Sequence, residues 1–239
     1  MRYYLMATLP ALGELGSVPP IGLAELAEHA AESPKMKRLV ESVLLADDLM
    51  QRDAFMAGEV KEVEPVVLSE EVARNEARLP EYLVSSDTQH DYDAQVDPVW
   101  HEYFRHVTEL GCREGNGFLP RWAGFEIGLR NRLVEERARR LELDAARYRV
   151  ATDVIPDEGS VDDCSDAIRR WVAATTPLEG LRELIRVRWE WLDRNERWFS
   201  FSEDELLVYA ARLLLLEQWQ RVNDEATQAA AETADRADL

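Results

Sequence analysis

The longest periodic stretch of the chain runs from about Pro120 to Leu143, and its apolar residues recur at intervals of three and four. This spacing places them along one side of an α-helix. A helix of that length would measure roughly 36 Å and would extend across a whole domain. We therefore expect one long helix that spans an elongated multi-helix bundle.

Other segments show the same spacing and begin with helix-capping residues. In Ser33-Pro34 and in Asp97-Pro98, a capping side chain precedes a proline at the first helical position. Ser202 and Glu205 form a capping box. Helices are expected over 21–32, 34–58, 69–79, 120–143, 177–195 and 202–223. A further helix is expected to begin at residue 98 and to be ended by the glycines at 111, 115 and 117.

The segments between these helices give few signs of β-structure. Residues 59–68 are interrupted by Pro65 and predict a connector or a short edge strand. Residues 85–97 predict a polar loop, and an acidic break is expected over 151–167. We therefore predict an all-α fold and allow for a short extended segment at the N-terminus.

The charge is distributed unevenly along the chain. The 239 residues carry a formal net charge of −19, with 28 basic and 47 acidic residues. Residues 1–118 hold 10 basic and 22 acidic residues, whereas 119–149 hold eight arginines and five acids. We predict an acidic N-terminal helical region over 1–118 and a second helical region over 119–223 that continues the same fold. The acidic tail over 224–239 is expected to be frayed or disordered, or to continue as a solvated helix.

This acidity argues against two classes of partner. Negative proteins repel phosphate backbones and anionic lipid headgroups, so we expect no nucleic-acid partner.

The apolar run Leu206–Leu216 has 11 residues and contains Arg212, far short of the roughly 20 residues that span a bilayer. The apolar start before Pro10 is short for a secretory signal. We expect a cytoplasmic protein, peripheral to the inner membrane only through a protein complex.

No motif in the sequence indicates chemistry. His101 and His106 in WHEYFRH are five residues apart, which turns them about 140° from each other on a helix, so we expect no metal site. Cys112 and Cys164 lack metal or disulfide spacing and are expected to be free thiols in a reducing compartment. We expect no catalytic residues and no cofactor.

Charged residues do lie on or beside apolar helix faces. Glu126 and Arg130 flank the face that carries Trp122, and Glu217 falls in the middle of the apolar stripe of 202–223. A buried carboxylate without a partner costs several kcal/mol. We therefore predict that Glu126 and Glu217 form ion pairs with arginines such as Arg121, Arg130 or Arg221.

Two further features leave a packing role and a binding role open. The arginines of 119–149 form either a solvated helix face or a docking face for an acidic protein. Five of the seven tryptophans follow residue 170, Trp219 among them, and they mark either a second core or a patch that faces a partner.

Three blocks of the chain resemble a known family. They are the opening RYYLMATLP with Pro19-Pro20, the run RWAGFEIGLRNRL, and the closing PLEGLRELIRVRWEWLD with LLVYAARLLLLEQWQR. Together they resemble a family of uncharacterised bacterial proteins encoded with V/A-type ATP synthases. That family is remotely similar to the C subunit of these synthases, whose counterpart in the eukaryotic V-ATPase is the d subunit.

The resemblance implies a non-catalytic, all-helical subunit or assembly factor at the cytoplasmic face of a rotary ATPase. Its partners would be the central-shaft and proteolipid-ring subunits, which it would couple in ion transport. The positions that match the family are Tyr3, Tyr4, Pro10, Trp122, Phe125, Glu126, Leu129, Arg130, Asn131, Glu217, Trp219 and Gln220.

Two other interpretations stay open from the sequence alone. One is an enzyme that uses a Glu/Arg pocket without a recognised motif. The other is a homo-oligomeric scaffold unrelated to the pump.

Overall fold

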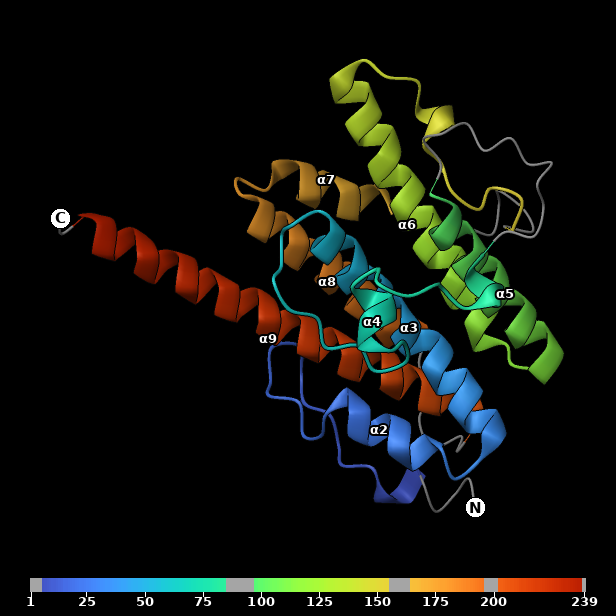
Figure 1. Ribbon diagram of the computed structural model, residues 1–239. Coiled ribbons are helices and arrows are strands. Elements are labelled where there is room, and N and C mark those ends of the chain that lie inside the picture. The colour runs from blue at the N-terminus through green and yellow to red at the C-terminus, as the bar shows by residue number, and fades with distance from the viewer. Residues whose placement is uncertain (1–5, 85–96, 155–163, 196–201, 238–239) are drawn as a thin grey trace.

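A computed structural model describes residues 6–84, 97–154, 164–195 and 202–237 (Figure 1). In these ranges all regular secondary structure is helical, which confirms the predicted all-α class. The segments are α2 (Leu23–Ala30), α3 (Pro34–Met56), α4 (Glu70–Ala73), η1 (Glu81–Leu83), α5 (Pro98–Glu114), α6 (Phe118–Leu141), η2 (Ala145–Arg147), α7 (Ser165–Ala173), α8 (Pro177–Asn195) and α9 (Glu203–Ala237). The expected extended segment at the N-terminus falls partly on residues 1–5, outside the described ranges.

The capping signals determine where two helices begin. The Ser33 hydroxyl accepts the backbone N–H of Met36 at 3.5 Å before Pro34 starts α3. The Asp97 carboxylate accepts the N–H groups of Val99 and Trp100 and starts α5. Both caps satisfy N–H groups that the first helical turn leaves without an intrahelical acceptor. The predicted starts at residues 34 and 98 are confirmed.

Gly111 does not help to end α5, contrary to the prediction. The helix continues to Glu114, and Gly115 ends it in the left-handed conformation at φ 67°. A Cβ atom on Gly111 would lie 2.6 Å from Pro120 Cδ. Gly111 therefore lets α6 begin directly against α5, and the two helices lie side by side in Figure 1.

Residues 57–69 form neither helix nor strand. The edge strand considered for 59–68 is therefore absent from this described segment. The Asp48 carboxylate on α3 accepts hydrogen bonds from the backbone N–H groups of Val66, Val67 and Leu68 at 2.7 to 2.9 Å. This side chain therefore satisfies N–H groups that a neighbouring strand would bond in a sheet. The following helix, α4, ends at Ala73 rather than near residue 79.

The second half of the chain differs from the prediction at two places. Helix α7 occupies Ser165–Ala173, where the sequence suggested the end of an acidic break and no helix. Helix α9 does not stop near Asn223 but continues to Ala237, so the helical alternative for the tail is the one observed. The end of α9 projects from the rest of the molecule in Figure 1. Helix α8 has the predicted bounds.

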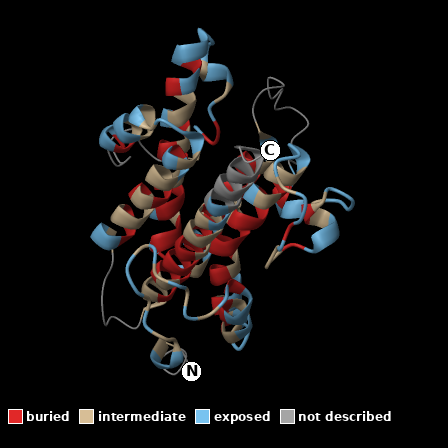
Figure 2. Ribbon diagram, turned by 90° about the vertical axis from the view of Figure 1, so that its left-hand side faces the viewer, coloured by how far each residue is buried: buried red, intermediate tan, exposed pale blue. Residues whose placement is uncertain are grey.

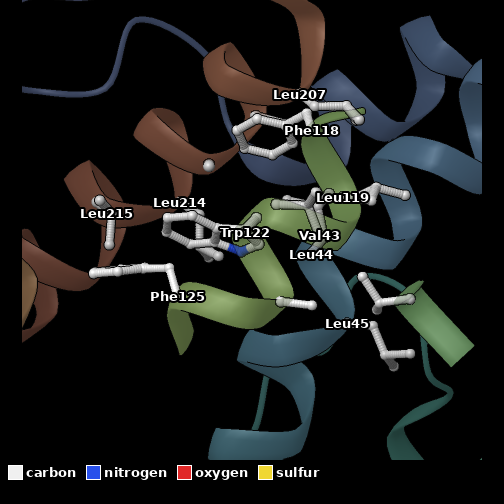
Figure 3. Packing of buried hydrophobic residues seen from close by; sticks show 14 of the residues in the cluster. Val43, Leu44, Leu45, Phe118, Leu119, Trp122, Phe125, Leu207, Leu214 and Leu215 are labelled. Carbon is white, nitrogen blue, oxygen red and sulfur yellow. The ribbon is translucent and has the colours of Figure 1, made fainter. Parts of the chain in front are cut away.

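The core forms where α3, α5, α6, α8 and α9 meet. Buried residues gather on the inner sides of the helices in Figure 2. Figure 3 shows Phe118, Trp122 and Phe125 of α6 among leucines of α3 and α9. Trp191 of α8 completes this aromatic group, with its ring centroid 5.0 Å from that of Phe125. No helix in the described ranges is long and apolar enough to cross a membrane.

Candidate functional site

A cavity of about 380 Å³ lies between the helices that form the core. Helix α6 supplies Trp122, Glu126 and Arg130 to its lining, all three named from the sequence, together with Leu133, Val134 and Arg137. The rest of the chain supplies side chains of mixed character. They are Val43, Ala46 and Met50 from α3, Asp97, Trp100, Tyr103 and Phe104 at α5, Tyr148 and Val150 after η2, Arg188 from α8, and Leu214, Leu215 and Gln218 from α9. The cavity thus joins apolar walls to a few charged groups.

The Glu126 carboxylate is paired with Arg188 of α8. The Nε and one terminal nitrogen of Arg188 donate to the two carboxylate oxygens at 2.7 and 2.9 Å. The exposed fractions of the Arg188 and Glu126 side chains are 19% and 16%. Such a two-point contact is stronger and more directional than a single hydrogen bond. The predicted carboxylate thus has an arginine partner, but that partner is none of the arginines named from the sequence.

Arg130 instead lies over the face of Trp100. The guanidinium carbon is 4.2 Å from the ring centroid, within the range of a cation–π interaction. The indole Nε1 of Trp100 donates to Asp53 at 2.7 Å. Burial lowers the pKa of Arg130, and the carboxylates of Asp97 and Asp53 raise it to a smaller degree.

Two further polar groups of the cavity, Tyr103 and Gln218, bond to neighbours, and Arg137 lies over the ring of Trp171 at 5.5 Å. The Tyr103 hydroxyl donates to the Ser42 carbonyl at 3.1 Å, and burial raises the pKa of this phenol. The Gln218 amide donates to Asp47 at 2.9 Å. These contacts orient side chains on α5 and α9 toward α3.

A second polar cluster joins α3 to α9 beside the cavity. Asp47 accepts hydrogen bonds from Arg221 at 2.5 Å and from the Gln218 and Gln51 amides. The neighbouring carboxyl of Asp48 has its pKa raised to about 6, because burial outweighs its three backbone hydrogen bonds. Arg221 therefore pairs with a carboxylate of α3 that the sequence analysis did not name.

Glu217 has a different role from the predicted ion pair. Its carboxylate accepts the backbone N–H of Leu23, the first residue of α2. Burial raises the pKa of Glu217, and the charge of Arg221 lowers it to a smaller degree. Gly22 at the N-cap of α2 has no capping side chain, so Glu217 of α9 supplies the acceptor from another helix.

The other site residues predicted from the sequence lie away from the cavity. Arg121 is exposed near the start of α6 and donates to the Gly117 carbonyl and to Asn195. Asn131 is buried and exchanges two hydrogen bonds with the backbone of Val150, at 2.9 and 3.0 Å. Trp219 packs close to Gly16 at the start of the chain. The family-like positions Tyr3 and Tyr4 fall outside the described residues.

Sequence reasoning missed Arg188, Trp100 and Asp47. A signal for Arg188 was present, because it follows the buried Ile185 by three residues and precedes the buried Leu192 by four. That spacing places a charge on an apolar helix face. Asp47 follows the buried Val43 by four residues and the buried Leu44 by three, so it too lies on an apolar helix face. The same apolar-face spacing that identified Glu217 on α9 would have identified Arg188 and Asp47.

No family model, curated protein or solved structure matches this chain. Within the described ranges, no group of three or more His, Cys, Asp or Glu residues is positioned to hold a metal ion. Interpretation of the site therefore depends on its own geometry.

Proposed function

We propose that this chain is a non-catalytic peripheral subunit or assembly factor of a bacterial V/A-type ATP synthase, similar to the C subunit. In this role it couples the central shaft to the proteolipid ring. It lies at the cytoplasmic face of the membrane through protein partners, binds no nucleic acid and uses no cofactor. The proposal begins from the three family-like sequence blocks.

The observation that best supports it is the convergence of these blocks, which are far apart in the sequence. The Tyr209 hydroxyl of α9 donates to the Pro10 carbonyl at 3.0 Å. The Gln220 amide donates to the carbonyls of Gly16 and Ser17. Glu126 and Arg188 join the long-helix block to α8. The family-like residues therefore belong to one packed unit, as expected if they are constrained together.

The polar contacts between helices suit a protein that transmits force. Charged or amide side chains connect α6 to α8 through Glu126, α3 to α9 through Asp47, and α9 to α2 through Glu217. Directional bonds of this kind resist sliding of one helix past another better than apolar packing alone. We further propose that the bundle is elongated and spanned by α6, so that it carries load along its length.

The enzyme alternative gains less support from the site. Glu126 is the carboxylate that α6 contributes to the cavity lining, and Arg188 occupies both of its oxygens. A general base needs access to a substrate proton. Glu217, the other acid considered for a Glu/Arg pocket, is absent from the cavity lining.

The test is co-purification of the tagged full chain from detergent extracts of its native cells. We expect central-shaft and proteolipid-ring subunits in the eluate, identified by mass spectrometry. An unrelated acidic protein with the same tag is the control. Recovery without any shaft or ring subunit would contradict the proposal, and recovery of the chain only with copies of itself would favour the homo-oligomeric scaffold.

Matched charge reversals can locate the contact. Arg139 lies on the basic part of α6 with its side chain 75% exposed, and Lys37 lies on α3 with its side chain 50% exposed. We expect Arg139→Glu to reduce recovery of an acidic partner and Lys37→Glu to leave it unchanged. Equal recovery with both variants would argue against docking through the arginines of 119–149.

A further inference from the structure

We infer that the cavity between α3, α5, α6 and α9 binds a small amphipathic monocarboxylate, with Arg130 as the group that binds the carboxylate. The inference rests on the cavity alone and does not depend on the proposed role in an ATP synthase.

The size and walls of the cavity suit a small apolar body. Its volume of about 380 Å³ falls within the ~300–1,000 Å³ typical of small-molecule sites. Val43 and Ala46 of α3 face the cavity, as do Leu214 and Leu215 of α9. A hydrocarbon chain in this space would be removed from water, which is favourable in proportion to its buried area.

Most polar groups of the lining already have partners. Arg188 is bonded to Glu126, and Tyr103 to the Ser42 carbonyl. Asp97 caps α5, and Gln218 donates to Asp47. These contacts fix the orientation of the groups that shape the cavity.

Arg130 differs from them in its contacts. Arg137 also lines the cavity and lies over the Trp171 ring at 5.5 Å, but its side chain is exposed, whereas Arg130 is half-buried. The Trp100 ring covers one face of the guanidinium, and the guanidinium forms no hydrogen bond to any residue that the structure describes. Its N–H groups lie in the plane of the guanidinium and so remain available at its edge. Burial has the largest effect on the pKa of Arg130 and lowers it, while the carboxylates of Asp97 and Asp53 raise it.

The geometry of the donor selects the class of ligand. The edge of a guanidinium matches the two oxygens of a carboxylate, which accept a pair of parallel N–H bonds. A dianion is disfavoured, because Asp53, Asp97 and Glu126 all act electrostatically on Arg130. One negative charge on an apolar body therefore fits better than a phosphate monoester.

The first experiment compares four probes with the same eight-carbon chain. Octanoate, octanol, octylammonium and octyl phosphate are titrated into the full chain by calorimetry. Quenching of tryptophan fluorescence provides a second readout, since Trp100 and Trp122 line the cavity. We expect octanoate to bind more tightly than the other three. A preference for octylammonium, octanol or octyl phosphate would overturn the assignment.

The second experiment compares two arginines on the same helix. Arg130→Met should weaken octanoate binding by roughly tenfold to a hundredfold, as expected for the loss of a charge-assisted hydrogen bond. Arg132 is paired with Glu135 and is not part of the cavity lining, so Arg132→Met should leave binding unchanged. Equal affinity of the Arg130→Met variant and the unmodified protein would overturn the role of Arg130.

A third variant keeps the test valid if Arg130→Met does not fold. Ala46→Phe fills part of the apolar wall and retains Arg130, so it should abolish octanoate binding. Circular dichroism verifies the fold of each variant before titration. Undiminished binding in a folded Ala46→Phe variant would show that octanoate binds outside the cavity and would overturn the inference.

Discussion

The carboxylate of Glu126 on α6 accepts two hydrogen bonds from the guanidinium of Arg188 on α8, and the two residues are 62 positions apart. Both side chains are largely removed from solvent. Replacing one of them by alanine leaves the other charged and partly buried. We expect Glu126→Ala or Arg188→Ala to lower the free energy of unfolding by about 2 kcal/mol.

Urea denaturation of both single variants and of the double variant measures this coupling. The interaction energy from the double-mutant cycle should be roughly 1 to 3 kcal/mol. Asp166 and Arg169 are the control pair, because their side chains are 76% and 77% exposed and their interaction should be close to zero. A coupling no larger than that of the control pair would contradict an interhelical role for Glu126.

Asp48 should make stability depend on pH between about 4 and 6. Its pKa is raised from 3.8 to about 6, so the folded state binds this proton more tightly than the unfolded state does. The corresponding contribution is complete below pH 4 and is lost as the pH rises through about 6, by an amount on the order of 2 to 3 kcal/mol.

The comparison with Asp48→Asn isolates this effect, since the other acids titrate in both proteins. We expect the stability advantage of the unmodified protein over the variant to shrink from pH 4 to pH 7. Urea unfolding at unit pH intervals measures it. A gap that stays constant or widens as the pH rises would be inconsistent with a raised pKa at Asp48.

Glu217 should control the start of α2 from another helix. Glu217→Ala removes the acceptor of the Leu23 N–H, which should cost about 1 kcal/mol and increase hydrogen exchange at that amide. Glu217→Gln keeps an acceptor and should retain most of the protection. The control is Glu25→Ala, because the Glu25 side chain is 54% exposed within α2. Unchanged exchange at Leu23 in Glu217→Ala would disprove the cap.

Two helical glycines should respond oppositely to alanine. A methyl group on Gly111 would meet Pro120 and Leu119 within 3.0 Å, so Gly111→Ala should destabilise the protein by roughly 1 to 3 kcal/mol. Gly124 of α6 has open space around the same position, so Gly124→Ala should stabilise it by up to about 1 kcal/mol. Thermal unfolding of both variants checks the pair, and equal shifts would argue against close contact of α5 and α6 at Gly111.

The features predicted correctly from the sequence depend on neighbouring residues in the chain. The Ser33 and Asp97 caps and the spacing within α8 need only local geometry, and their positions are confirmed. The predicted end of α9 near Asn223 was wrong, because the tail lacks large apolar residues. The alanines and glutamates there favour helix without them, which accounts for the helical alternative being the one observed. Helix α7 was missed because it is short and follows an acidic segment.

The site was harder to predict than the helices. Glu126 and Glu217 were identified as acids on or beside apolar faces, but their partners come from α8 and from the first turn of α2. Which helix faces meet depends on packing over the whole chain, and spacing within one helix carries no such information. Apolar-face spacing would have selected Arg188 and Asp47, but it would not have paired them.

The contact between Tyr209 and Pro10 has a consequence for synthesis of the chain, because 199 residues separate its two members. A ribosome releases the first helices long before α9 exists, so α2 and α3 emerge without the helix that covers them. Leu26, Val40 and Leu44, which are fully buried in the finished protein, face solvent or a chaperone during that interval. Folding of the N-terminal segment is therefore completed only after α9 has been synthesised.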